Sequence, residues 1–447
     1  MAKIHHLYHI FITFALSKLM PMQKFIVIIG CLLACLSMQA QDTVKNYWKN
    51  HQLMSIGVEK DGKEEGHWIY YHYNGTKWTE GDFRNGKKVG VWKVWYEDGR
   101  INQEYHADNG PFKSWYPSGA IESEGQFAKG KRNGQWTFYH PNGKIFKNVN
   151  YRADSIHGHA VEYFDNGKKY FEGDYNMGEL EGYACWWTKD GEKSMEGNSV
   201  NGLQQGEWKF YHLNGQLGSK GNFDHGLQNG DWTYYYEEGQ LWKSGSYQEG
   251  QREGLWKAWY EDGKLQRQGS FSNDKEEGEW VSYYPSGKEQ DHGYFHQGEM
   301  TGMWTGWYED GHQKYAIQYK NGKMNGSYTY YWEETKHKSK EGHYKDNLKH
   351  GAWKDYAQNG KVFAQGKYAN DKKQGKWTFY NVQEVKVREQ NFKDDVAEGK
   401  FTEYYENGKK HYTGAFKNRL KEGKWIYWKP NGEIYQVIRY SNGREIQ

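Results

Sequence analysis

Aromatic and glycine residues recur along this chain with a period of 24 residues, separated by mostly polar positions. Each unit begins with a glycine, which we number place 0. In the unit 254–277 the recurring residues are Trp256 at place 2, Trp259 at place 5, Asp262 and Gly263 at places 8 and 9, Gly269 at place 15 and Phe271 at place 17. Short apolar–polar alternations bounded by Asp-Gly or Asn-Gly are typical of β-strands joined by tight turns. The pattern therefore predicts one β-hairpin in each unit.

The period continues over most of the chain. Thirteen of the fifteen spacings between place-0 glycines are 24, one is 20 and one is 25. Place 5 is aromatic in all sixteen units, and place 2 is aromatic in all but two, which have Ala160 and Ala184. The place-0 residues are Gly66, Gly90, Gly110, Gly134, Gly158, Gly182, Gly206, Gly230, Gly254, Gly278, Gly302, Gly326, Gly351, Gly375, Gly399 and Gly423. Such a period predicts a repeat array at residues 66–447 rather than separate globular domains, with residues 41–65 as a degenerate capping repeat.

The dipeptide at places 8 and 9 sets the expected pairing within each hairpin. Asn-Gly and Asp-Gly favour a two-residue type I′ turn, which would pair place 7 with 10, 6 with 11 and 4 with 13. Trp256 then lies opposite Gly269, and the glycine leaves room for an indole to cross the neighbouring strand. Because an isolated hairpin is marginally stable, the units should stack edge to edge. The predicted fold is all-β: an elongated single antiparallel sheet, or solenoid, of about sixteen stacked 24-residue hairpins.

Residues 1–40 read as an N-terminal extension and signal peptide. Lys24 precedes an apolar run at residues 25–36, and Ala40 precedes Gln41, an order that is typical of secretion signals. We expect cleavage after Ala40; the alternative is lipidation of Cys35 in a lipobox-like sequence. Met1 and Met22 both remain candidate starts. The predicted location is outside the cytoplasm: periplasmic, outer-membrane-associated or secreted.

The composition indicates which residues form the core and which classes of partner are excluded. Hydrophobic residues make up 36% and aromatic residues 18%, so aromatic rings must replace much of the usual aliphatic core. Removing residues 1–40 takes away three lysines and no acid, which brings the net charge from +3 to zero. A balanced charge argues against nucleic acid as a partner and leaves a lipid anchor as the only predicted link to a membrane. Only Cys185 remains in the exported chain, so no internal disulfide is expected.

The repeated sequence Gly-x-Trp-x-x-Tyr-Tyr-x-x-x-Gly, followed by Gly-x-Tyr or Gly-x-Phe, resembles the MORN repeat over roughly residues 42–443. It is most similar to the bacterial variant, which is often labelled the antitoxin component of toxin–antitoxin systems. The resemblance implies a binding or scaffolding protein.

No catalytic arrangement is apparent. Carboxylates such as Glu261 and Asp262 fall at turn places, where turns favour acidic residues. His157 and His159 have ligand-like spacing, but no nearby residue completes a metal set. We therefore predict a protein without catalytic residues, metal or cofactor.

The predicted binding surface is a row of tyrosines at place 6. Tyrosine occupies this place in four successive units, as Tyr236, Tyr260, Tyr284 and Tyr308. These rings offer rigid contact area for a partner protein, or they hold the sheet together. If they only hold the sheet, the irregular units near Ala160, Ala184 and Trp332 become the candidates. The predicted function is a protein-binding scaffold in the bacterial cell envelope; the alternatives are a glycan-binding module and an antitoxin- or immunity-like partner of an effector.

Overall fold

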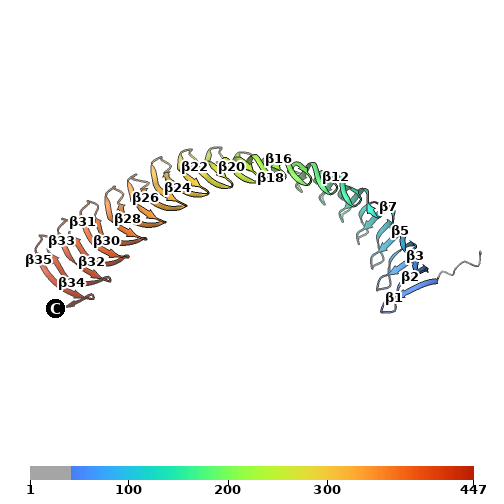
Figure 1. The fold of residues 1–447 in the computed structure, drawn as a ribbon, viewed down its shortest axis with the longest axis horizontal. Coiled ribbons are helices and arrows are strands. Elements are labelled where there is room, and N and C mark those ends of the chain that lie inside the picture. Colours follow the sequence, from blue (N-terminus) through green and yellow to red (C-terminus); the bar gives the residue numbers. More distant parts are fainter. Residues whose placement is uncertain (1–41, 447) are drawn as a thin grey trace, which may run out of the picture. The chain divides into compact units, whose positions relative to one another are not determined.

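The computed structural model describes residues 42–446, and this part of the chain contains strands and turns but no helix (Figure 1). It divides into two compact units. Unit 1 comprises residues 42–168 and 175–178, and unit 2 comprises residues 169–174 and 179–446. The predicted signal peptide, Ala40 and Cys35 lie outside the described residues.

The strands of unit 1 pair antiparallel with their neighbours in chain order, and β8 pairs with both β9 and β10. They are β1 (Asp42–Tyr47), β2 (Leu53–Lys60), β3 (Lys63–Tyr71), β4 (Lys77–Arg84), β5 (Lys87–Trp95), β6 (Ile101–His106), β7 (Asn109–Trp115), β8 (Ile121–Ala128), β9 (Lys131–Arg132), β10 (Gly134–Tyr139), β11 (Ile145–Arg152) and β12 (Ser155–Tyr163). β13 (Lys169–Asn176) is divided between the units. The first hairpin, β1–β2, falls in the segment predicted as a capping repeat; its capping role stays a prediction.

Unit 2 continues the same antiparallel pairing between consecutive strands. They are β14 (Glu179–Trp187), β15 (Lys193–Val200), β16 (Leu203–Tyr211), β17 (Leu217–Asp224), β18 (Leu227–Tyr235), β19 (Leu241–Gln248), β20 (Gln251–Trp259), β21 (Leu265–Ser272), β22 (Lys275–Tyr283), β23 (Glu289–His296), β24 (Glu299–Trp307), β25 (Gln313–Lys320), β26 (Lys323–Tyr331), β27 (Lys338–Lys345), β28 (Leu348–Tyr356), β29 (Val362–Ala369), β30 (Lys372–Tyr380), β31 (Lys386–Lys393), β32 (Val396–Tyr404), β33 (Lys410–Lys417), β34 (Leu420–Trp428), β35 (Ile434–Ser441) and β36 (Arg444–Ile446). The predicted fold class, an open antiparallel sheet of stacked hairpin repeats, is confirmed.

The turn predicted at places 8 and 9 is wrong in type. In the unit 254–277, Trp259 pairs with Leu265, the Tyr260 N–H donates to the Lys264 carbonyl, and the Gly263 N–H donates back to the Tyr260 carbonyl. This is a three-residue loop, in which the glycine at place 9 has positive φ (82° at Gly263). The residue at place 8 keeps negative φ because its side chain accepts a hydrogen bond from the N–H of place 10, as Asp262 does from Lys264.

The type I′ turn lies instead between hairpins, at places 19 and 20. Ser272 pairs with Lys275 across Asn273 and Asp274, whose φ angles are 50° and 64°. Two successive positive φ angles match the right-handed twist of the flanking strands. The strand that follows passes through a β-bulge at the place-0 glycine, for example Gly278 with φ 73°, which side-chain-bearing residues rarely adopt.

Each indole at place 2 ties its hairpin to the preceding one. Trp256 pairs in register with Gly269 as predicted, but its ring lies over Gly245, the place-15 glycine of the unit before. A Cβ atom on Gly245 would be 2.2 Å from Cδ2 of that indole, so a side chain there is excluded. The indole Nε1 donates to the Ser246 carbonyl at 3.1 Å, and Tyr247 meets the ring edge-on at 5.1 Å. Trp256 is only 6% exposed.

In one contact between repeats, the side-chain sizes at place 15 and at place 2 of the next repeat are reversed. Unit 1 has Ala160 where other units have the tryptophan, and Val149 replaces the glycine opposite it. Both are buried, with Val149 1% and Ala160 0% exposed. In unit 2, Ile317 also replaces the glycine at place 15, and it pairs with Tyr328. The Val149–Ala160 pair thus exchanges the large and small sides of one contact, and this contact belongs to two neighbouring repeats.

Candidate functional site

The predicted tyrosine row lies within the hydrogen-bond network of the array. Each hydroxyl donates to the place-5 carbonyl of the next unit: Tyr236 to Trp259 at 2.8 Å, Tyr260 to Tyr283 at 2.7 Å, Tyr284 to Trp307 at 2.9 Å and Tyr308 to Tyr331 at 2.9 Å. The rings are half-buried, and Tyr308 is only 9% exposed. The four residues therefore lie in successive hairpins and connect each hairpin to the next.

Other residues at place 6 make the same bond. In His72, His140 and His212 the ring Nε2 lies 2.9–3.0 Å from the carbonyl of place 5 in the next unit. Trp332, in the repeat with one extra residue, donates through Nε1 to the Tyr356 carbonyl at 3.2 Å. In these units place 6 thus varies in residue type while keeping a donor, whereas Phe164 and Ala357 at the same place have none.

The irregular unit near Ala184 also keeps a filled core. Gly173 is approached by the Ala184 Cβ and by the ring of Phe171, each 2.9 Å from where a glycine Cβ would stand. Phe171 lies 5.0 Å from Trp186. The missing indole is thus replaced by a neighbouring phenylalanine.

Sequence reasoning missed a set of exposed aromatic side chains that stand at place 12. This place is the extra residue of the bulge that follows the three-residue loop, so it has no partner across the strand. Its aromatic occupants are between 40% and 51% exposed: Trp78, Phe146, Tyr170, Trp242, Phe363 and Tyr435. They lie beside the loop end of their hairpins. A sequence signal existed, because place 12 is aromatic in these units and polar or glycine in most others.

Polar side chains bridge neighbouring hairpins on the opposite face from the indoles. Glu196 in β15 accepts hydrogen bonds from Tyr183 in β14 and Tyr211 in β16, and from Lys193 Nζ at 2.5 Å. Burial would raise the pKa of Glu196, but these hydrogen bonds outweigh burial and lower the pKa to about 2. Burial also raises the pKa of the neighbouring Cys185 thiol. The cluster fixes the register of three strands.

Acid should weaken unit 2 through such carboxylates. The pKa values of Glu196, Glu341 and Glu389 are all lowered from 4.5 to about 2 by hydrogen bonds that outweigh burial. A lowered folded-state pKa stabilises the protein above the unfolded pKa, and this stabilisation is lost as pH falls toward the folded value. We expect Glu196→Gln to lower the free energy of unfolding near neutral pH by about 1–3 kcal/mol.

The same variant should lose less stability than wild type between about pH 5 and pH 2, because it lacks one of the titrating groups. Urea unfolding of unit 2 at several pH values measures this. Glu207→Gln, which changes an exposed carboxylate paired with Lys209 at 3.1 Å, is the control. Parallel pH profiles for wild type and Glu196→Gln would contradict the assignment.

Between residues 42 and 446, no group of three or more His, Cys, Asp or Glu side chains is arranged to hold a metal ion. The same part of the chain has no helix long and apolar enough to cross a membrane.

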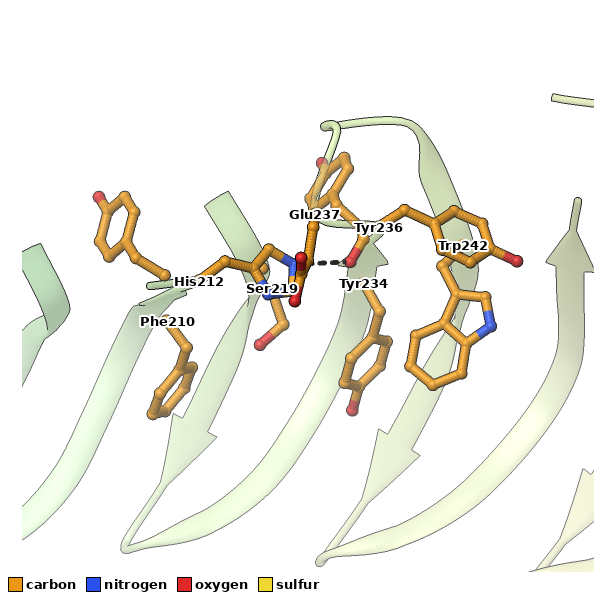
Figure 2. Close-up of a pocket in the computed structure, with 10 residues that line it drawn as sticks. Phe210, His212, Ser219, Tyr234, Tyr236, Glu237 and Trp242 are labelled. Carbon is orange, nitrogen blue, oxygen red and sulfur yellow. Dashed lines mark hydrogen bonds between the residues drawn. The ribbon is translucent and has the colours of Figure 1, made fainter. Parts of the chain in front are cut away.

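One pocket, of about 420 Å³, opens at the loop end of β16–β19 in unit 2 (Figure 2). Aromatic rings form most of its wall, including Phe210, Tyr234, Tyr236 and Trp242. Its polar lining is His212, Ser219 and Glu237. Its wall is mainly apolar, and the pocket is wide open to solvent.

Comparison with known sequences identifies the repeat. Ten segments match the family described as "MORN repeat variant": 88–109, 108–129, 132–153, 156–177, 204–225, 228–249, 252–273, 276–290, 349–370 and 397–418. The chain carries MORN repeats. The MORN resemblance predicted above is thereby confirmed. No curated protein matches the chain.

Solved structures similar to this MORN array are distant. One is a crystal structure of TcdB2-TccC3-TEV, at 10% identity and a TM-score of 0.14, with 87% of this chain covered. Another is a Tc holotoxin pore of Photorhabdus luminescens, at 10% identity and a TM-score of 0.13, with 90% covered. The chain spans 22% and 24% of the length of these two chains.

Proposed function

We propose that this chain is a non-catalytic MORN-repeat scaffold that is exported and binds a protein partner in the bacterial cell envelope. Support for binding comes from one observation: the place-12 aromatics are exposed, whereas the aromatics at places 2 and 6 are engaged within the array. Rigid aromatic side chains contribute strongly to protein–protein interfaces. Support for export comes from the signal-like order of residues 24–40.

The net charge of the chain affects how strongly a charged partner protein would be attracted to it. Without residues 1–40 the net charge is zero, so long-range attraction of a charged partner is weak. Apolar contacts should then provide most of the binding free energy, and affinity should change little with salt.

The test is capture of envelope proteins by the chain starting at Gln41. We expect the triple variant Trp242→Gln, Phe363→Gln, Tyr435→Gln to capture less partner protein than wild type, by about tenfold or more. Each of the three substitutions removes an exposed ring. Glutamine already occupies place 12 as Gln266 and Gln290, so the repeat accepts it.

The control has the same number of exposed apolar side chains removed elsewhere. Leu203, Leu227 and Leu420 are 48–51% exposed and lie next to the type I′ turns. Changing all three to glutamine should leave capture intact. Equal loss in both triple variants, or loss in neither, would contradict binding through place 12.

The row Tyr236, Tyr260, Tyr284 and Tyr308 stays a prediction as a second binding surface. Its ring edges are half-buried, so a partner could reach only part of each ring. The antitoxin- or immunity-like role likewise stays a prediction from the sequence.

A further inference from the structure

Two small residues open the pocket in Figure 2 at this point of the array. Gly218 and Ser219 occupy places 12 and 13 of their hairpin, and the next hairpin has Trp242 and Lys243 at the same places. Ser219 pairs with Phe210 on one side and with Tyr234 on the other, so it leaves a gap between two rings. The pocket therefore arises where small residues in one repeat meet a large one in the next.

The aromatic wall is held in place by the protein. Trp242 lies 6.0 Å from Tyr236 and 6.4 Å from Tyr234, measured between ring centroids. Lys243 Nζ is 4.4 Å from the centroids of both Trp242 and Tyr234, and this cation–π contact steadies the indole. Trp242 nevertheless remains 40% exposed. The wall thus presents a fixed, flat apolar surface to solvent.

Some polar groups around this wall are engaged within the described chain, and others are not. Hydrogen bonds engage Tyr236 Oη with the Trp259 carbonyl and His212 Nε2 with the Tyr235 carbonyl. By contrast, no bond within residues 42–446 engages His212 Nδ1, Ser219 Oγ, the Glu237 carboxylate or Trp242 Nε1. Glu237 is the only charged residue in the lining.

We propose that this pocket binds a neutral sugar unit of a glycan. The apolar C–H face of a pyranose ring would pack on Trp242, and its hydroxyls would bond Ser219, His212 and Glu237. An apolar peptide side chain would fill the same space but would cover these polar groups without replacing their bonds to water, which is unfavourable. An acidic ligand would meet the Glu237 carboxylate. The pocket shares Trp242 with the place-12 surface proposed above for protein binding, whereas Phe363 and Tyr435 of that surface lie outside the pocket.

Two variants test the site with little change to the repeat. Trp242→Gln removes the apolar wall and installs the residue that stands at the same place in the next two hairpins, Gln266 and Gln290. Gly218→Phe fills the pocket and reproduces a pair already present in unit 1, where His140 and Phe146 lie 5.0 Å apart. Tyr294→Gln removes an exposed ring of unit 2 that belongs neither to the pocket nor to place 12, and it serves as control.

The measurement is isothermal titration calorimetry of the chain starting at Gln41 with neutral oligosaccharides of glucose, mannose and N-acetylglucosamine. We expect saturable binding of at least one of them. Trp242→Gln and Gly218→Phe should each weaken that binding about tenfold or more, and Tyr294→Gln should leave it unchanged. Thermal melts check that all three variants fold.

Several outcomes would overturn the proposal. They are the absence of binding by every oligosaccharide at millimolar concentration, binding that persists in both pocket variants, and binding lost equally in Tyr294→Gln. A short peptide with an exposed aromatic residue is titrated in parallel. If only the peptide binds, and Trp242→Gln abolishes its binding, the pocket is a peptide site and the glycan assignment fails. Capture by the double variant Phe363→Gln, Tyr435→Gln, which leaves the pocket intact, distinguishes failure of the protein-binding proposal from failure of the glycan assignment.

Discussion

Replacing Trp256 by alanine should destabilise the array by about 3–5 kcal/mol, the usual cost of removing a buried large aromatic side chain. The indole is 6% exposed and donates to the Ser246 carbonyl, so the variant loses ring packing and also leaves that carbonyl without its donor. In a repeat array each unit contacts only its neighbours, so the loosening should stay within the adjacent hairpins. Urea unfolding measures the size of the effect, and hydrogen exchange measures its extent.

The complementary change, Gly245→Val, should also be strongly destabilising. Gly245 does not have positive φ, so its backbone accepts a side chain, but the Cβ would lie 2.2 Å from the Trp256 ring. Trp280→Ala, made at the equivalent place in the next unit, should repeat the result of Trp256→Ala. If Trp256→Ala lowered the free energy of unfolding by well below about 1 kcal/mol, this would contradict a buried indole that stabilises two neighbouring hairpins.

The second large effect is expected from the tyrosine row. Changing Tyr236, Tyr260, Tyr284 and Tyr308 to phenylalanine removes four hydrogen bonds to backbone carbonyls and keeps the rings. At about 0.5–1.5 kcal/mol for each bond, the quadruple variant should lose about 2–6 kcal/mol of stability. Thermal and urea unfolding measure the loss.

Exposed tyrosines provide the matched control for this row. Tyr73 and Tyr294 are 59% and 45% exposed, and changing them to phenylalanine should have little effect on stability. If the quadruple variant keeps its stability and instead loses its captured partner, the row acts as a binding surface rather than as a connection between hairpins.

The sequence was sufficient for the repeat, the hairpins and the pairing of tryptophan with glycine, because period and residue size determine them. It misplaced the type I′ turn. Asn-Gly and Asp-Gly favour that turn in isolation, but at places 8 and 9 the Asn or Asp side chain accepts the N–H of place 10 and keeps its own φ negative, as Asp262 does. The dipeptides at places 19 and 20, such as Asn85-Gly86, were the better signal.

Because the turn type at places 8 and 9 was mispredicted, the exposed aromatic residues at place 12 were not recognised from the sequence. A two-residue turn would pair place 12 with place 5, as Trp242 with Tyr235, and would leave no unpaired residue. The observed loop pairs Tyr235 with Leu241 instead, so Trp242 becomes the extra residue of a bulge. The pocket beside it could not be found from the period either, because it depends on the contrast between Gly218 and Trp242 in adjacent repeats.

Each indole at place 2 packs on the place-15 glycine of the preceding repeat. A double-mutant cycle tests this contact most directly. Trp256→Ala combined with Gly245→Val recreates the Ala160–Val149 pair of unit 1, in which both side chains are buried. The free energy of unfolding of the double variant should recover most of the loss seen in the two single variants. Trp256→Ala combined with Gly221→Val, whose glycine lies under Trp232, should instead show additive losses. If the losses of unfolding free energy were also additive for Trp256→Ala with Gly245→Val, they would contradict a direct contact between these two residues.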